Sequence, residues 1–229
     1  MIKSVFFDLD DTLIATYEEA YRNHLETTQA LGLEMPPEHE FFKHYGLPWK
    51  KLIQALWPSI PFEKFSETYG NNIARYPLIA GADHILTALK SQNLVLGILT
   101  TREAHSANIL LEKHNIAQYF DLVVCCAEHI HKPDPRSFDQ VLHKLHSSGI
   151  KKEELLYTGD SLNDFKAAYH ARIHFVGVLT GYTRKDDFIN EGLSPENIID
   201  SVHHLPLYVK EFNKRLEANP YIDNPRVLP

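Results

Sequence analysis

A short apolar strand that ends in a cluster of carboxylates constrains this chain more than any other feature. Residues 5–7 are Val-Phe-Phe, which predicts a buried strand, and three aspartates follow within four positions, Asp8, Asp10 and Asp11. While the chain stays extended, Asp8 and Asp10 project from the same face. Two anions so close repel each other unless a cation or a shifted pKa relieves them, and Mg2+ takes oxygen ligands of this kind. The alternative for this stretch alone is a solvated acidic turn.

The overall charge of the chain limits the partners it can have. Its 229 residues carry a formal net charge of −7, whereas nucleic acids and anionic membranes select a basic surface, so we expect neither as a partner. No apolar stretch approaches the roughly 20 residues of a membrane span, and the N-terminus shows no signal-peptide pattern. The two cysteines, Cys125 and Cys126, are adjacent and poorly placed to bridge each other. These features predict a cytoplasmic protein.

The hydrophobic periodicity of the sequence divides the chain into two kinds of stretch. Residues 16–76 show helical spacing, so we predict an all-helical insert, or cap, with a helix from residue 17 that stops at Gly32 and helices at 38–45, 49–57 and 62–73. From residue 77 onward strands alternate with helices, which predicts an α/β core with a doubly wound parallel sheet, comprising residues 1–15 and 77–218. We predict that residues 219–229 form an extended tail. The predicted later strands are 94–99, 122–125, 155–157, 174–178 and 198–199, and the helices are 82–91, 103–114, 135–146, 163–169, 185–190 and 205–215.

Polar residues follow four of the predicted strands. They are Asp8 and Asp10, then Thr100 and Thr101, then Lys132, then Asp160 and Asp164. The carboxyl ends of parallel strands meet in one crevice, so these side chains should lie together. A carboxylate nucleophile, a second carboxylate for proton transfer, an ammonium and a hydroxyl are what phosphoryl transfer needs. Taken singly, each residue has a simpler explanation. Either threonine could be a helix N-cap and the lysine a solvated loop residue. Asp160 could be a helix cap and Asp164 an exposed charge in the first turn of a helix.

Together these segments resemble the haloacid dehalogenase (HAD) superfamily, on its phosphatase side. The family's Asp-x-Asp-x-Thr motif is matched by residues 8–12, and its Thr or Ser at the end of a later strand by Thr100. Its Lys-Pro pair is matched by residues 132–133, and its Gly-Asp-x-x-x-Asp motif by residues 159–164. The helical insert matches the position of the family's cap.

Two segments nearer the C-terminus, 177–182 and 198–201, are similar to the phosphoglycolate phosphatase-like branch of the family. Two positions depart from that branch. Thr101 stands where Asn is common, and residues 170–172 read His-Ala-Arg where an Ala-Gly pair is common. Neither departure touches the four motif positions, but both weaken the assignment of a single substrate.

The resemblance implies an Mg2+-dependent phosphatase with a Rossmann-like core and a helical cap, acting through an aspartyl-phosphate. It implies that Asp8 is the nucleophile and that Asp10 is the general acid and base. The implied metal ligands are Asp8, Asp10 (through its backbone carbonyl), Asp160 and Asp164, the last either directly or as a partner of a ligand, and the implied phosphoryl-binding residues are Thr100, Thr101 and Lys132. We further expect Asp11 to face solvent. One alternative for Arg102 is contact with a substrate carboxylate, but the expectation is a solvated residue at a helix N-terminus.

Several alternatives stay open at this stage. A sugar-phosphate mutase or a nucleotidase shares the core motifs, and a small phosphorylated metabolite is the common class of substrate. A receiver domain of two-component signalling also combines acidic residues with a Thr and a Lys, but its phosphate acceptor follows a later strand and it has no helical insert. The cap decides the substrate, and its aromatic and polar residues show no readable pattern, because aromatics at such spacing are usually core: Tyr17, Tyr21, Arg22, His24, His44 and Trp49. The sequence predicts no oligomeric state.

Overall fold

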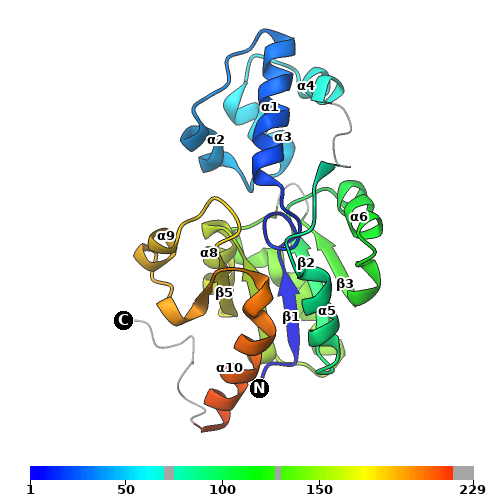
Figure 1. Ribbon diagram of the computed structural model, residues 1–229, viewed down its shortest axis with the longest axis vertical. Coiled ribbons are helices and arrows are strands. Elements are labelled where there is room, and N and C mark those ends of the chain that lie inside the picture. Colours follow the sequence, from blue (N-terminus) through cyan, green and yellow to red (C-terminus); the bar gives the residue numbers. More distant parts are fainter. Residues whose placement is uncertain (70–74, 127–129, 219–229) are drawn as a thin grey trace.

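The computed structural model describes residues 1–69, 75–126 and 130–218, and Figure 1 shows them as two stacked parts. The larger part is a sheet with helices around it, and the smaller part is a group of helices above one end of that sheet. The end of the helix predicted to reach residue 73 and the predicted tail at 219–229 lie outside the described residues. No helix within the described ranges is long and apolar enough to cross a membrane.

Six parallel strands form the sheet: β1 (Ser4–Phe7), β2 (Val95–Thr100), β3 (Leu122–Cys125), β4 (Leu155–Gly159), β5 (His174–Val178) and β6 (Ile198–Ile199). Their order across the sheet is β3-β2-β1-β4-β5-β6, and every neighbouring pair is parallel. The chain therefore runs from β1 to one edge and then crosses back to build the other, which makes β1 the point where the strand order reverses. Ligands of open α/β sheets bind at such a point. The predicted doubly wound parallel sheet is confirmed.

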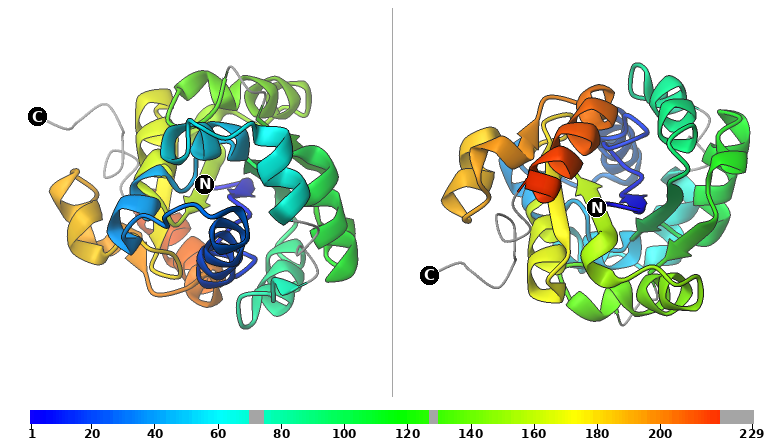
Figure 2. Two further views of the ribbon diagram at one scale, coloured as in Figure 1. Left: turned by 90° about the horizontal axis from the view of Figure 1, so that it is seen from above. Right: turned by 90° about the horizontal axis from the view of Figure 1, so that it is seen from below.

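Helices cover both faces of this sheet (Figure 2). On one face lie α5 (Ala82–Lys90), α6 (Ala104–Lys113) and α10 (Leu205–Ala218), and on the other lie α7 (Asp139–Ser147), α8 (Leu162–Ala171) and α9 (Lys185–Asn190). Side chains alternate along β1, so that Val5 and Phe7 pack with the first group of helices and Phe6 with the second. Burial on both faces explains why β1 is a continuous apolar run.

The smaller part is the cap, formed by α1 (Tyr17–Leu31), α2 (Glu38–His44), α3 (Trp49–Leu56) and α4 (Phe62–Tyr69). It has an aromatic core of its own around Phe41, Trp57 and Phe65. The arrow of β1 points toward this cap in Figure 1, and Figure 2 places the cap over the middle of the sheet. The cap therefore stands over the carboxyl ends of the strands, where the polar motif residues lie.

Several elements begin or end at other residues than predicted. β4 continues to Gly159, beyond the predicted end of the strand, because its ladder with β5 extends that far. The helix predicted at 135–146 begins with a 3-10 turn, Pro135–Phe138, before α7 starts. Asp134 caps that turn by accepting a hydrogen bond from the backbone N–H of Arg136 at 2.9 Å. Other 3-10 turns lie at Ala117–Tyr119, Lys152–Glu154, Pro195–Asn197 and Val202–His204.

Candidate active site

The polar strand ends meet at a cavity between the cap and the sheet, with a volume of about 260 Å³. Five of the predicted site residues line it: Asp8, Asp10, Thr101, Lys132 and Asp160. The other two, Thr100 and Asp164, are fully buried behind its wall. The expectation that parallel strand ends would bring these residues together is met.

Lys132 lies at the centre of this group and is only 3 % exposed. Its Nζ donates hydrogen bonds to Asp8 Oδ1 at 2.7 Å and to Asp164 Oδ1 at 2.5 Å. Burial alone would lower the pKa of this ammonium, but the charges of Asp164 and Asp8 raise the pKa above its ordinary value, so the ammonium stays protonated. The simpler explanation of Lys132 as a solvated loop residue is therefore wrong.

Tyr157 completes the environment of Lys132 and was not singled out from the sequence. Its hydroxyl accepts a hydrogen bond from Lys132 Nζ at 3.0 Å and lies 2.8 Å from Asp164 Oδ1 and 3.0 Å from the carbonyl oxygen of Leu99. The residue is fully buried in β4. A buried tyrosine in an apolar strand needs a partner for its hydroxyl, and that is the one sequence signal that could have identified it.

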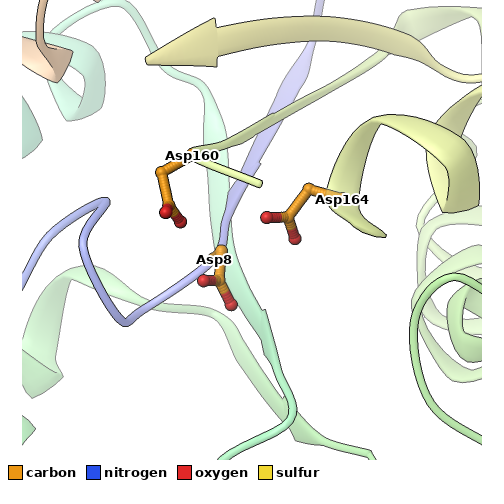
Figure 3. A group of neighbouring side chains, drawn as sticks. All are labelled: Asp8, Asp160 and Asp164. Atoms are coloured by element: carbon orange, nitrogen blue, oxygen red, sulfur yellow. The ribbon is translucent and has the colours of Figure 1, made fainter. Parts of the chain in front are cut away.

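Three carboxylates form a group that could hold a metal ion. Asp8, Asp160 and Asp164 each offer an oxygen, and these oxygens all lie within 4.8 Å of one another. Figure 3 shows the three side chains turned toward a common space from the end of β1, the end of β4 and the start of α8. Asp164 also completes the capping box of α8, because its Oδ2 accepts hydrogen bonds from the backbone N–H and hydroxyl of the N-cap residue Ser161 at 3.1 and 2.5 Å. Asp164 is fully buried, so its simpler explanation as an exposed first-turn charge is wrong.

Two glycines make room for these carboxylates. A Cβ at Gly159 would lie 2.5 Å from Asp164 Cγ, and a Cβ at Gly181 would lie 1.9 Å from Asp160 Oδ2. Any side chain at either position would collide with a carboxylate. The Gly-Asp pair of the fourth motif therefore has a steric basis.

Negative charge exceeds positive charge in the buried part of the site. Among the described residues, the buried charged side chains there are one lysine and four aspartates: Lys132, Asp8, Asp11, Asp160 and Asp164. Burial raises the pKa of Asp8 to about 8, with the Lys132 charge opposing and the Asp164 charge adding to the rise. Burial and neighbouring carboxylates also hold the pKa of Asp160 well above its usual range. An all-oxygen donor set with surplus negative charge fits a hard divalent cation such as Mg2+.

Asp10 points away from the carboxylate group and toward Arg102. The guanidinium donates from Nε to both oxygens of Asp10, at 3.1 and 3.0 Å, and from Nη2 to Oδ1 at 2.5 Å. Its Nη1 donates to the hydroxyl of Ser106 at 2.8 Å, and its Cζ lies 5.4 Å from the ring centroid of Tyr76. The prediction of a solvated Arg102 is wrong, because this bidentate ion pair holds the side chain at 16 % exposure on the cavity wall.

Asp11 is also buried, at 1 % exposure, and the prediction that it faces solvent is wrong. Its backbone is left-handed, with φ of 55°, which turns the side chain back toward the first helix of the cap. There Oδ1 accepts hydrogen bonds from the N–H groups of Thr16 and Tyr17 at 2.7 and 2.9 Å, and Oδ2 accepts one from the Thr16 hydroxyl at 3.0 Å. Asp11 therefore caps α1 and joins the cap to β1.

We expect Asp11→Ala to lower the free energy of unfolding by about 1 to 3 kcal/mol, because it removes a helix cap and places a Cβ-bearing residue without a polar group in a left-handed conformation. Urea unfolding followed by circular dichroism would measure the loss. Asp11→Asn is the matched control, since asparagine accepts the same N–H bonds and tolerates this backbone, and it should lose less than about 1 kcal/mol. Equal losses in both variants would contradict the capping role.

The two threonines after β2 have different surroundings. Thr101 lines the cavity and donates a hydrogen bond from its hydroxyl to the carbonyl oxygen of Gly46 in the cap, at 3.1 Å. Thr100 is buried, and its hydroxyl accepts a hydrogen bond from the backbone N–H of Arg102 at 3.1 Å. That bond closes a local turn before α6, whose N-cap position is Glu103, so the simpler explanation of Thr100 as a helix N-cap is wrong. The role of both residues in holding a phosphoryl group stays a prediction.

Most of the cap aromatics form its core, as their spacing indicated. Tyr17 and Tyr21 pack against Phe42 with ring centroids 5.5 and 5.9 Å apart. His24 is 2 % exposed, and its burial lowers its pKa to about 4. Trp49 and His24 differ from the two tyrosines because they also line the cavity.

Comparison with known proteins identifies the family. The model described as haloacid dehalogenase-like hydrolase matches residues 5–178, which is more than half of the chain. The chain belongs to this family. The predicted resemblance is thus confirmed, the protein is an enzyme of the HAD-like hydrolases, and the receiver-domain alternative falls away.

Named relatives cover nearly the whole chain. A phosphoglycolate phosphatase of Photobacterium profundum is 28% identical over 227 residues, which cover 91% of this chain and 96% of the relative. A pyrophosphatase PpaX of Oceanobacillus iheyensis is 26% identical, with 88% and 94% covered. The predicted similarity to the phosphoglycolate phosphatase-like branch is confirmed by such relatives.

Solved structures share the fold at lower identity. A hydrolase from Pseudomonas syringae superimposes with a TM-score of 0.72 at 22% identity, covering 91% of this chain and 98% of that one. CbbY from Rhodobacter sphaeroides, solved in complex with phosphate, gives 0.71 at 22% identity, with 90% and 96% covered. Both matches extend over the core and the cap.

Proposed function

We propose that this HAD-like hydrolase is an Mg2+-dependent phosphatase that hydrolyses a small phosphate monoester through an aspartyl-phosphate on Asp8. The observation that carries the proposal is the position of the Asp8 carboxylate. It lies on the cavity wall, 2.7 Å from the buried Nζ of Lys132, and belongs to the group of three carboxylates that could hold a metal. A substrate cavity that opens onto a carboxylate beside a cation suits covalent phosphoryl transfer.

The reaction would proceed in two displacements at phosphorus. In the first, an oxygen of Asp8 forms a bond to phosphorus while the bond to the ester oxygen breaks. The ester oxygen takes a proton from Asp10, which requires that one Asp10 oxygen turns from Arg102 and carries that proton while the other oxygen keeps its bond to the guanidinium. In the second, water attacks the phosphorus of the aspartyl-phosphate and gives its proton to Asp10. Inorganic phosphate leaves and Asp8 is restored. Lys132 holds Asp8 in place and offers positive charge to the phosphoryl oxygens.

Asp8 and Asp160 are the side chains that would hold Mg2+, together with the backbone carbonyl of Asp10. When bound, the ion supplies positive charge beside the phosphoryl oxygens. Both oxygens of Asp164 are already engaged, one by Lys132 and the other by Ser161. We therefore place Asp164 as the residue that orients Lys132 next to the ion.

Contacts between the cap and the core support the exclusion of water during the first step. The ring of Phe42 in the cap stacks on Tyr182 of the core, with centroids 4.5 Å apart. At the exposed rim, Lys51 Nζ lies 2.8 Å from His131 Nε2. Together with the bond from Thr101 to the cap, these contacts keep the cap seated over the cavity. A dry site strengthens the electrostatic interactions that stabilise a phosphoryl group.

The proposal predicts phosphate release that depends on a divalent cation. Purified protein with MgCl2 should release phosphate from small monoesters, EDTA should abolish the release, and added Mg2+ should restore it, because the surplus buried carboxylates need a cation before they can bind an anionic substrate. A colorimetric phosphate assay across phosphoglycolate, pyrophosphate, sugar phosphates and nucleoside monophosphates would measure this. Turnover that survives chelation would contradict the proposal, and interconversion of sugar-phosphate isomers without net phosphate release would favour a mutase.

A further inference from the structure

The wall that the cap contributes to the cavity is apolar and aromatic. Within the described part of the cap, the residues that line the cavity include no aspartate, glutamate, lysine or arginine. The side chains that form most of this wall are Ala20, Tyr45, Leu47, Trp49, Leu52 and Tyr69. Trp49 and Tyr69 lie against each other, with ring centroids 4.9 Å apart. The wall faces the strand ends, so it meets the part of a substrate that lies beyond the phosphoryl group.

His24 is the titratable nitrogen base on this wall, and its contacts keep it neutral. Its Nδ1 lies 2.6 Å from the carbonyl oxygen of Ala20, and its Nε2 accepts a hydrogen bond from Trp49 Nε1 at 3.2 Å. The indole can only donate, so the imidazole proton must be on Nδ1. Burial among aromatic rings lowers its pKa to about 4. His24 therefore offers no positive charge to a substrate at neutral pH.

The cations on the core side already have anionic partners. Lys132 is paired with Asp8 and Asp164, and Arg102 is paired with Asp10 through both oxygens. Further carboxylates line the same cavity, at Asp11, Glu103 and Asp160, and His105 lies exposed at its margin. A second anionic group on the substrate would meet these carboxylates without an unpaired lysine or arginine among the described lining residues to receive it.

The size of the cavity suits one phosphoryl group and a ring. A cavity of roughly 150 Å³ is enough to hold benzene, and this one measures about 260 Å³. We infer that the substrate is a phosphate monoester of an uncharged alcohol whose aromatic or other apolar group packs against Trp49, Leu47 and Leu52. This inference rests on the proposed phosphatase function and adds the class of leaving group. It predicts discrimination against leaving groups that carry a carboxylate or a second phosphate.

Three esters test the inference because they share the same P–O–CH2 unit and differ only in what it carries. They are benzyl phosphate with a neutral ring, ethyl phosphate with a methyl group, and phosphoglycolate with a carboxylate. We expect kcat/KM in the presence of Mg2+ to fall in that order, with benzyl phosphate about ten- to a hundredfold better than ethyl phosphate. Phosphoglycolate or pyrophosphate as the best substrate would overturn the inference while leaving the phosphatase function intact.

Variants of the cap wall test which side chains cause the preference for benzyl phosphate over ethyl phosphate. Trp49→Ala should lower kcat/KM for benzyl phosphate about tenfold and leave that for ethyl phosphate within about threefold, because only the ring loses a surface to pack against. Leu56→Ala is the matched control, since Leu56 lies on the same helix and packs in the cap core outside the cavity. Equal losses for both esters in Trp49→Ala, with Leu56→Ala unaffected, would contradict the proposed packing.

A charge placed on the wall supplies a test that does not depend on removing an aromatic residue. Leu47→Lys should raise kcat/KM for phosphoglycolate and lower it for benzyl phosphate, inverting the order of the wild-type chain. Calorimetric titration with the non-hydrolysable analogue benzylphosphonate separates the two proposals. If this analogue binds more tightly than ethylphosphonate but no ester is hydrolysed, the phosphatase function fails although the cap wall still binds the ring, whereas equal affinities overturn the inference.

Discussion

Asp8→Asn should reduce phosphate release by at least about 10⁴-fold, because an amide cannot form the bond to phosphorus. The loss should occur without unfolding. Burial raises the pKa of Asp8 to about 8, so an ionised carboxylate at this position costs free energy in the metal-free fold, and a neutral isostere relieves that cost. We therefore expect the melting temperature of Asp8→Asn in EDTA at pH 8 to equal or exceed that of the wild-type chain.

Two measurements separate loss of the nucleophile from general damage. Mass spectrometry of wild-type protein quenched with acid during turnover should show one added phosphoryl group on the peptide that contains Asp8, and Asp8→Asn should show none. Asp139→Asn is the matched control, since Asp139 is exposed in the first turn of α7 and is not among the residues that line the cavity. Asp8→Asn that keeps more than a tenth of the wild-type rate would contradict the assignment of the nucleophile.

The sequence predicted the grouping of the site because parallel strands bring their carboxyl ends to one edge. Lys132 lies 124 residues from Asp8 in the chain, and nothing local to either residue indicates that they meet. The regular alternation of strands and helices supplied that information, since it predicts parallel strands whose carboxyl ends all lie at the same edge of the sheet. The identity and the order of the strand-end residues were therefore enough to predict the main components of the site.

Two charged residues were misplaced because their partners depend on tertiary structure. Asp11 follows a strand in a polar turn, where exposure is the ordinary outcome, and only its left-handed backbone turns it onto the N–H groups of α1. Arg102 lies near the start of a helix, where solvation is again usual. In the structure its guanidinium donates a hydrogen bond to Asp10, which is 92 residues away in the chain. Local patterns indicate what kind of position a residue occupies, and they do not reveal a partner from another strand end.

The cap illustrates the same limit for function. Helical spacing correctly placed its aromatic residues in a core, but it could not separate Trp49, which also faces the cavity, from Trp57, which packs inside the cap. Both are apolar residues with helical neighbours. The distinction depends on how the cap is seated over the sheet, and that is set by contacts such as the stacking of Phe42 on Tyr182.

Lys132→Met should lower the free energy of unfolding by about 3 to 5 kcal/mol in EDTA at pH 8 and abolish phosphate release. The substitution keeps a similar volume but leaves Asp8 and Asp164 without the ammonium that bonds both of them. The effect should grow with pH. In the wild-type chain Asp8 loses its proton near pH 8, and without the Lys132 charge its pKa rises further.

The sign of this pH dependence follows from proton counts. Above pH 8 the folded variant still binds a proton at Asp8 that the unfolded chain has released, so its stability falls by about 1.4 kcal/mol per pH unit relative to the wild-type chain. At pH 6 Asp8 is protonated in both folded proteins, and the difference should be smaller. Urea unfolding at pH 6 and pH 9 in EDTA would measure both values. A destabilisation that is constant with pH would show that lost packing, and not an unpaired carboxylate, is its cause.

A double variant separates the electrostatic role of Lys132 from its catalytic role. Asp164→Asn added to Lys132→Met removes one of the two carboxylates left unpaired, and the amide oxygen can still cap α8 at Ser161. The double variant should therefore recover about 1 to 3 kcal/mol relative to Lys132→Met. Phosphate release should stay absent, because the ammonium beside Asp8 is still missing. Recovery of activity together with stability would mean that Lys132 serves only to neutralise buried charge.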